Sequence, residues 1–149
     1  MESLKNTVFI PGNVPSSKNS KINTSKGSFM SKTVKKYLRT FGIQNYSSSK
    51  KTVTYYKTIP MTFPVEELKQ LFNNIKYPIY IQFHFIRGTK HKADFQNIVQ
   101  ILLDLFTAFD IIPDDNMDFV FPVPLVIEGK GYSYNKEEPG VYISIKQIK

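Results

Sequence analysis

The chain has 149 residues, 41% of them hydrophobic, which is enough for one hydrophobic core and predicts a single domain over residues 1–149. It contains no cysteine, so disulfides and thiolate chemistry are excluded, both as metal ligand and as nucleophile. No secretory signal follows Met1, and the longest nearly apolar stretch, residues 119–127, is too short to span a bilayer. We therefore expect a cytoplasmic protein with no membrane partner.

The net charge of +8 is unevenly distributed along the chain. Residues 1–92 hold 16 Lys and Arg against 3 Asp and Glu, whereas residues 93–149 hold 4 against 9. A basic first half indicates a polyanionic partner, with a merely solvated basic surface as the alternative. The basic residues form no amphipathic helix with a wide apolar face, so nucleic acid is favoured over a membrane surface.

The first third of the chain predicts a strand, a loop and a helix. The β-branched and aromatic run 7–10 is typical of a strand, and Pro11-Gly12 ends it. Residues 14–21 are a polar loop whose lysines could hold phosphates. Ser31 is placed to cap a basic helix over 32–40 that ends at Gly42.

The middle of the chain predicts a loop, two strands and a helix. Residues 45–51 have no apolar periodicity and indicate a mobile surface loop, and 53–59 is a β-rich segment. Residues 64–72 begin with a proline and two glutamates, which suits a helix N-terminus. The segment 79–86 alternates strongly and predicts a strand, with His84 on its less apolar side in a structural role.

The last third predicts a long helix from Asp94 and two more strands. Pro122 and Pro124 mark 119–127 as an edge or bulged strand, and 141–145 is the final strand. Strands and helices alternate without a regular βαβ rhythm. The fold class is therefore expected to be α+β, a single mixed sheet of about four or five strands with helices packed mainly on one face.

All of the aspartates lie between Lys90 and Asp118, in a protein that is otherwise basic. At about 100° per residue, Asp94, Asn97 and Asp104 share one side of the predicted helix, opposite a broad apolar face. The Asp114-Asp115 pair follows after a short apolar segment, so the turn could return these acids to the helix.

Converging carboxylates repel each other and need either a cation or raised pKa values. A hard, oxygen-liganded ion such as Mg²⁺ or Mn²⁺ suits them and supports phosphodiester hydrolysis. The simpler alternatives are a helix cap at Asp94 and turn residues at Asp114 and Asp115.

This stretch resembles the RusA-like Holliday-junction resolvases, small endonucleases common in phages and prophages. Their pattern is an Asp, an Asp-Asn two residues later, a Lys three residues after that Asn, a further helix Asp, and a paired Asp-Asp after an apolar segment. Asp94, Asn97, Asp104 and the pair Asp114-Asp115 stand at those positions without a gap. The opening strand with Pro15-Ser16-x-x-Asn19 is also similar to that family's first loop.

Two positions depart from the family pattern. Gln96 stands where a second catalytic acid would be, and Gln100 stands where a lysine would be. An amide oxygen can still ligate a metal but carries no charge, and Gln100 cannot act as a cation. The missing cation could come from Lys18 or from the basic triplet at 90–92.

The resemblance implies a structure-selective endonuclease that resolves Holliday junctions or other branched DNA with Mg²⁺ or Mn²⁺ and no small-molecule cofactor. It also implies a homodimer, since two-fold symmetry presents two equal sites to two equivalent strands. Asp94, Asp104 and Asp115 would be the catalytic and metal-ligating residues, with Asn97, Asp114 and Gln96 in support. DNA would be held by basic residues, namely Lys18, Lys21, Lys32, Lys35, Lys36, Lys90, His91 and Lys92.

Two alternatives remain open at this stage. One is a branched-DNA-binding protein that keeps the fold and has lost cleavage together with the acid at position 96 and the lysine at position 100. The other is a protein-interaction or scaffold module in which the charges only keep the chain in solution.

Overall fold

The computed structural model describes residues 6–16, 21–24 and 27–148, and within 21–29 only the backbone. Its main sheet has five strands, paired in the order β1-β9-β6-β7, with β8 also on β6. The strands are β1 (Val8–Pro11), β6 (Ile79–Arg87), β7 (Val120–Pro124), β8 (Tyr132–Tyr134) and β9 (Gly140–Gln147). Strand β9 is antiparallel to β1 and β6, whereas β7 and β8 run parallel to β6. The α+β prediction with one mixed sheet is confirmed.

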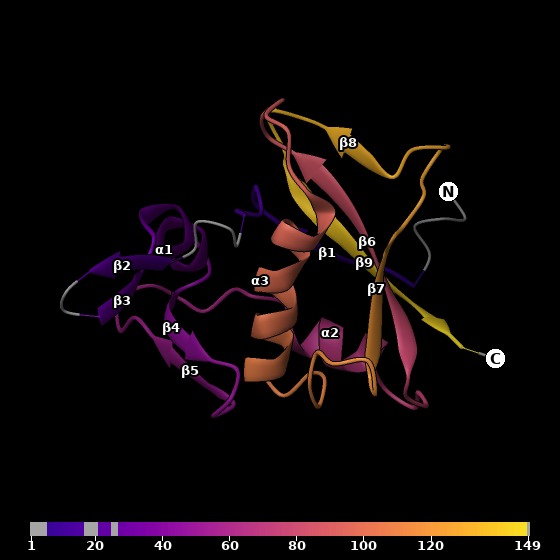
Figure 1. Ribbon diagram of the computed structural model, residues 1–149, viewed down its shortest axis with the longest axis horizontal. Coiled ribbons are helices and arrows are strands. Elements are labelled where there is room, and N and C mark those ends of the chain that lie inside the picture. The colour runs from indigo at the N-terminus through magenta and orange to yellow at the C-terminus, as the bar shows by residue number, and fades with distance from the viewer. Residues whose placement is uncertain (1–5, 17–20, 25–26, 149) are drawn as a thin grey trace.

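The long helix α3 (Phe95–Ala108) lies between this sheet and a smaller outer layer (Figure 1). The other described elements are α1 (Lys32–Arg39), α2 (Val65–Leu71), the hairpin β2 (Lys21–Thr24) with β3 (Gly27–Met30), and the hairpin β4 (Ile43–Ser47) with β5 (Thr52–Tyr55). Helix α3 contacts β4 on the side away from the main sheet. It is therefore covered on two sides, which explains why nine of its residues are buried.

The core between α3 and β6 is largely aromatic. The ring of Phe83 on β6 stacks on that of Phe106 on α3, with centroids 6.4 Å apart. Phe95, at the start of α3, meets Phe83 and Phe85 edge-on at 6.2 and 5.9 Å. Alternation places Ile79, Ile81, Phe83 and Phe85 on the helix side of β6, and these four side chains are buried. These contacts fix the position of α3 relative to the sheet.

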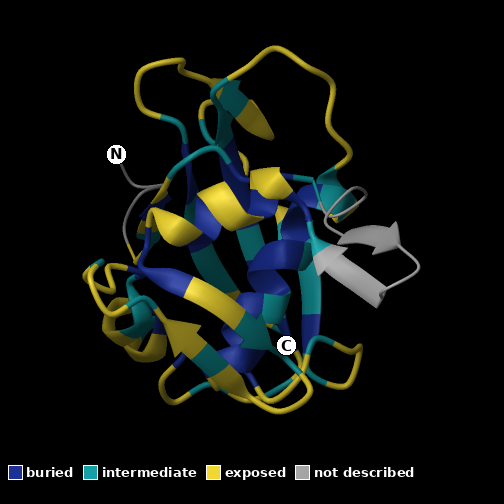
Figure 2. Ribbon diagram, turned by 90° about the vertical axis from the view of Figure 1, so that its left-hand side faces the viewer, coloured by how far each residue is buried: buried dark blue, intermediate teal, exposed yellow. Residues whose placement is uncertain are grey.

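Helix α1 has the two faces that its sequence predicts. The Oγ of Ser31 accepts a hydrogen bond from the backbone N–H of Val34 at 3.3 Å and so caps the helix. Val34, Tyr37 and Leu38 are buried, and the pKa of Tyr37 is raised by that burial. The four basic side chains point outward and are exposed. Figure 2 shows the same division across the molecule, with buried segments inside and exposed ones on the loops and outer helix faces.

Three local predictions need correction. Residues 45–51 are not simply a loop, because β4 continues to Ser47 and only the turn after it is irregular. The strand expected over 53–59 is shorter and belongs to the same hairpin, as β5. The hairpin β2–β3 and strand β8 were not predicted, and the three residues of β8 lie between turn-forming segments. In each case, pairing with a neighbouring strand overrides a weak local signal.

His84 is a structural residue that fastens the β8 segment to the sheet. It is 2% exposed, on the face of β6 opposite Phe83 and Phe85. Its Nδ1 lies 2.8 Å from the carbonyl oxygen of Leu125, and its Nε2 lies 2.6 Å from the Oγ of Ser133. The ring thus ties β6 to both ends of the connection between β7 and β8.

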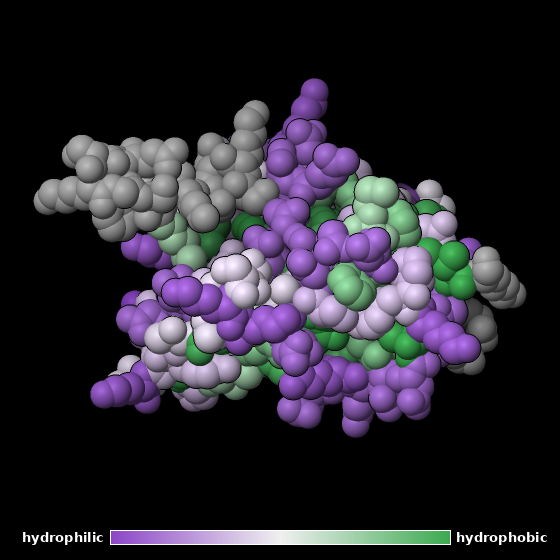
Figure 3. All heavy atoms as spheres, turned by 60° about the horizontal axis from the view of Figure 1, so that its bottom comes forward, coloured by the Kyte–Doolittle hydropathy of each residue, from purple (hydrophilic) through white to green (hydrophobic). Residues whose placement is uncertain are grey.

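None of the helices in the described part of the chain has the length and apolar character that a membrane span requires. On the side of the molecule shown in Figure 3, hydrophobic residues form small separate patches among hydrophilic ones.

Gly42 and Gly129 allow the stability of the fold to be tested with a matched pair of substitutions. Their φ angles are almost the same, +79° and +78°, in the left-handed region that disfavours side chains. A Cβ on Gly42 would lie 2.5 Å from the carbonyl oxygen of Pro60, whereas a Cβ on Gly129 meets nothing within 4 Å. Gly129→Ala should therefore lower the free energy of unfolding by about 1 kcal/mol, and Gly42→Ala by about 3 kcal/mol. Urea unfolding measures both, and equal losses would contradict the structure.

Candidate functional site

Helix α3 carries one narrow polar stripe on an otherwise apolar surface. Gln96 is exposed, and Asn97, Gln100 and Asp104 are half-buried. The stripe exists because the helix is covered on two sides, which leaves room for polar groups only along one line. The packing that holds α3 therefore also determines which of its side chains can reach a ligand.

Gln100 joins two of the predicted acidic residues. Its Nε2 donates hydrogen bonds to Oδ1 of Asp104 and to Oδ2 of Asp115, each at 2.8 Å. Asp104 is four residues along the same helix, where side chains meet, and Asp115 comes from the loop after the helix. Because both oxygens bond to one nitrogen, they lie no farther apart than twice that distance. The carboxylates of Asp104 and Asp115 thus form an acidic pair bridged by a neutral amide.

The loop that carries Asp115 is held by its own hydrogen bonds. Oδ1 of Asp114 accepts from the backbone N–H of Asp115 at 2.8 Å, and Oδ2 of Asp114 accepts from Nδ2 of Asn116 at 3.3 Å. Asp114 therefore holds the backbone of the turn that carries Asp115.

Lys51, on the turn between β4 and β5, holds the C-terminal end of α3 and the start of this loop. Its Nζ donates to the carbonyl oxygen of Thr107 in the last turn of α3 at 3.4 Å, and to those of Ile112 and Pro113 in the loop at 3.2 and 2.8 Å. It also forms an ion pair with Asp110 at 3.2 Å. A cation at this position suits the carbonyl groups left unpaired at a helix C-terminus.

Tyr46 on β4 lies within the electrostatic influence of the acidic pair. Its burial and the negative charge of Asp104 raise the pKa of Tyr46 to about 12. The hydroxyl therefore keeps its proton at neutral pH and can only donate or accept hydrogen bonds beside the carboxylates. No pattern in the sequence points to this tyrosine, because it lies almost sixty residues before Asp104.

Asp94 lies at the other end of α3. It occupies the N-cap position, is exposed, and accepts a 3.4 Å hydrogen bond from Nδ2 of Asn97, with no cap bond from its side chain to the backbone. Ten residues of helix separate it from Asp104, a rise of about 15 Å. Within the described residues, no three acidic or histidine side chains gather closely enough to hold a metal ion together. Of the predicted trio, the structure therefore brings together Asp104 and Asp115, with Asp94 apart from Asp104.

The predicted DNA-binding residues are placed as follows. Lys32, Lys35 and Lys36 are exposed on the outer side of α1. The loop from 90 to 92, between β6 and α3, is also exposed along all three basic residues. Lys21 begins β2, and Lys18 lies outside the described residues.

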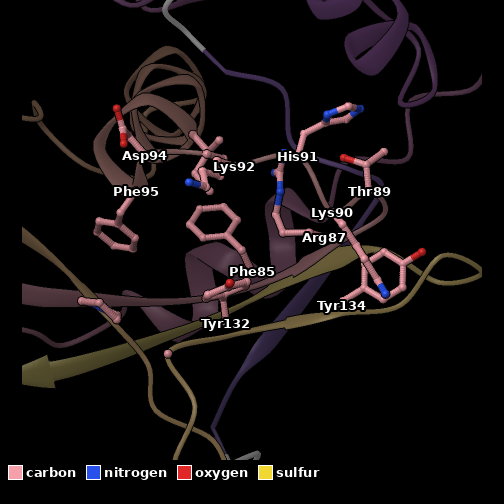
Figure 4. Close-up of a pocket in the computed structure, with 14 residues that line it drawn as sticks. Phe85, Arg87, Thr89, Lys90, His91, Lys92, Asp94, Phe95, Tyr132 and Tyr134 are labelled. Atoms are coloured by element: carbon pink, nitrogen blue, oxygen red, sulfur yellow. The ribbon is translucent and has the colours of Figure 1, made fainter.

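A cavity of about 720 Å³ opens beside Asp94 and was not predicted. Figure 4 shows residues from the end of β6, the 88–94 loop, the start of α3 and β8 around it. Tyr132 and Tyr134 are its most exposed aromatic residues, at 66% and 46%. In the sequence, only the Tyr-Ser-Tyr alternation at 132–134 points to this wall of the cavity. An alternation over three residues is too short to predict a strand. In the sequence, Gln100 shares the polar side of the helix with Asp104 four residues later, and this spacing is the signal for their hydrogen bond.

No protein-family model matches the chain, and no curated protein matches it.

Proposed function

We propose that this chain is a metal-dependent endonuclease that acts on branched DNA, as its resemblance to the RusA-like resolvases implies. The observation that carries the proposal is the convergence of Asp104 and Asp115 on Gln100, which places two carboxylates from separate segments side by side. An acidic pair in a chain of net charge +8 is the combination that such a reaction needs. Positive surface holds the DNA backbone, and the acids hold the ion.

The donor set of the acidic pair fits Mg²⁺ or Mn²⁺. Magnesium is commonly held by one or two carboxylates, with waters and substrate phosphates completing its coordination. Asp104 and Asp115 provide the two carboxylates, from separate segments of the chain. When bound, such an ion neutralises charge on the scissile phosphate and lowers the pKa of a coordinated water.

The chain's own residues have separate roles in this proposal. Gln100 orients both carboxylates, and Asp114 holds the turn that presents Asp115. Tyr46, which remains protonated, offers a hydroxyl beside Asp104. Asp94 is too far along α3 to share an ion directly with Asp104. We assign it, with Asn97, to the segment where the DNA strand approaches the helix N-terminus.

Recognition of DNA is assigned to the exposed basic groups of α1 and of the 90–92 loop. Such contacts read charge and backbone shape and carry no sequence information. A homodimer is part of the proposal, since a two-fold axis would present two acidic pairs to the two equivalent strands of a junction.

One observation favours a second candidate function, branched-DNA binding without cleavage. Gln100 already satisfies one oxygen of each carboxylate with an uncharged donor, and Gln96 adds no charge to the stripe. A protein that only binds junctions has no need for an ion at this pair.

Replacement of the acidic pair tests cleavage. Asp115→Asn or Asp104→Asn should lower the nicking rate of a synthetic four-way junction at least about 100-fold, because several kcal/mol of transition-state stabilisation are lost. Junction affinity should stay within about threefold of the unmodified protein, since the basic contacts that supply affinity remain. Nicking is measured in gels with Mg²⁺ and with Mn²⁺, and Mn²⁺ binding by electron paramagnetic resonance.

Asp118→Asn is the matched control, because Asp118 is exposed in the same loop, outside the acidic pair. Normal cutting by both Asp104→Asn and Asp115→Asn would refute the assignment of the site. Tight junction binding by the unmodified protein, without nicking in either metal, would favour the second candidate function.

The role of α1 predicts a defined salt dependence. The logarithm of junction affinity should fall linearly with the logarithm of salt concentration. Each phosphate contact should add about 0.9 to the steepness of that slope. Substitution of both Lys35 and Lys36 by Gln should reduce the slope by between about 1 and 2. The same change at Lys69, exposed on α2, should leave it unaltered. Fluorescence anisotropy at several salt concentrations measures the slope, and an unchanged slope in the double variant would exclude α1 from the interface.

A further inference from the structure

The cavity beside Asp94 differs in chemistry from the acidic pair. Its floor is formed by Phe85, which is 2% exposed, with Phe95 and Ile98 from the start of α3. One wall is β8 and the rim is the exposed loop from Thr89 to Asp94 (Figure 4). At about 720 Å³ it is within the size range of small-molecule sites, about 300–1,000 Å³.

The two tyrosines of β8 are fixed in place at this wall. In the parallel pairing of β8 with β6, Tyr132 lies beside Phe85 and Tyr134 lies beside Arg87, so both rings share the cavity side of the sheet. The residue between them, Ser133, is bound from the opposite face by His84 at 2.6 Å. The strand is short, but the histidine anchors it, and the tyrosine rings are exposed on a supported strand.

Positive groups surround these rings. The Nζ of Lys90 lies 5.2 Å from the centroid of the Tyr134 ring, in a cation–π arrangement that covers one face of that ring. Lys92 and His91 lie on the rim, and Asp94 is the one acidic side chain in the lining. Arg87 donates from one guanidinium nitrogen to the carbonyl oxygen of Val14 at 2.6 Å, and its Nε has no partner among the described residues. An exposed aromatic ring can stack on a nucleotide base, and the adjacent cations can bind the phosphate of the same nucleotide.

We infer that this cavity binds a single unpaired nucleotide of a DNA strand, with its base stacked on Tyr132 and its phosphate held by Lys90 and Lys92. Base–aromatic stacking tolerates any base, because every base has a π face, and basic groups follow the backbone. A base inside a duplex cannot use this cavity, since both of its faces are already stacked. The inference rests on the proposed function, and it adds that the protein selects DNA with unpaired nucleotides at the branch.

The test uses the full chain in EDTA, so that cleavage does not interfere. The probe is a DNA duplex with one unpaired 2-aminopurine, compared with a fully paired duplex of the same length. Binding should quench the fluorescence of the unpaired 2-aminopurine. Tyr132→Ala should abolish the quenching and weaken binding of the unpaired probe by about 5- to 30-fold, with less than about twofold change for the paired duplex.

Tyr55→Ala is the matched control, because Tyr55 is 47% exposed and lies on β5, outside this cavity. Tyr132→Phe, which keeps an aromatic ring, should restore both the quenching and the affinity. Tyr132→Leu keeps apolar area without a ring and should behave like Tyr132→Ala, so a loss caused by misfolding of the alanine variant is recognised. Quenching and affinity unchanged in Tyr132→Ala would overturn the inference, as would equal loss for paired and unpaired probes.

Asp115→Asn separates this inference from the proposed function. That variant should lose nicking and keep the full 2-aminopurine response. Quenching that depends on Tyr132 in a protein that never cuts would support the nucleotide cavity alone. Nicking that depends on Asp115, with quenching that ignores Tyr132, would leave the nuclease proposal in place and refute the cavity's role.

Discussion

The structure depends on the docking of α3 against β6 through aromatic side chains. Phe106 stacks on Phe83, and Phe95 meets both Phe83 and Phe85, so the helix is fixed in rotation and along its axis. Each such ring contributes burial of roughly 1.5–3 kcal/mol, and the ring geometry adds directionality. Because the outer layer covers α3 on its other side, rotation of the helix would bury a carboxylate or an amide. The polar stripe is thus a consequence of packing, and Gln100 and Asp104 lie half-buried along the one line where polar groups fit.

The acidic pair and the cavity beside Asp94 differ in how they are built. The acidic pair combines a helix residue, Asp104, with a loop residue, Asp115, and depends on Lys51 to hold the end of the helix beneath that loop. The cavity at the other end of α3 combines the helix start with β8 and depends on His84 behind the strand. Lys51 and His84 are each a single polar side chain, and each comes from a segment distant in sequence from the residues that it holds. The same helix therefore has an acidic region near one end and a basic, aromatic region at the other.

Much of the fold could be predicted from the sequence, since strong periodicity decides the long elements. The alternation of 79–86 and the apolar face after Asp94 identified β6 and α3, and Ser31 with Gly42 marked both ends of α1. Strand β4 was missed because its segment has no apolar alternation, and it is supported by its contacts with β5, α1 and α3. Spacing could suggest that Asp115 returns to the helix. It could not show that Gln100 would receive it, because that partner depends on the path of the loop.

The hydrogen bond between Gln100 and Asp115 joins two residues that are fifteen positions apart, across the end of α3. The number of residues between them determines whether the bond can form, whatever those residues are. One residue inserted after Ala108 would leave the helix and the sheet intact, yet it would move Asp115 out of register with Gln100. Most substitutions in this segment would therefore leave the bond in place. An insertion or a deletion there would give a folded protein in which Asp104 and Asp115 no longer lie together.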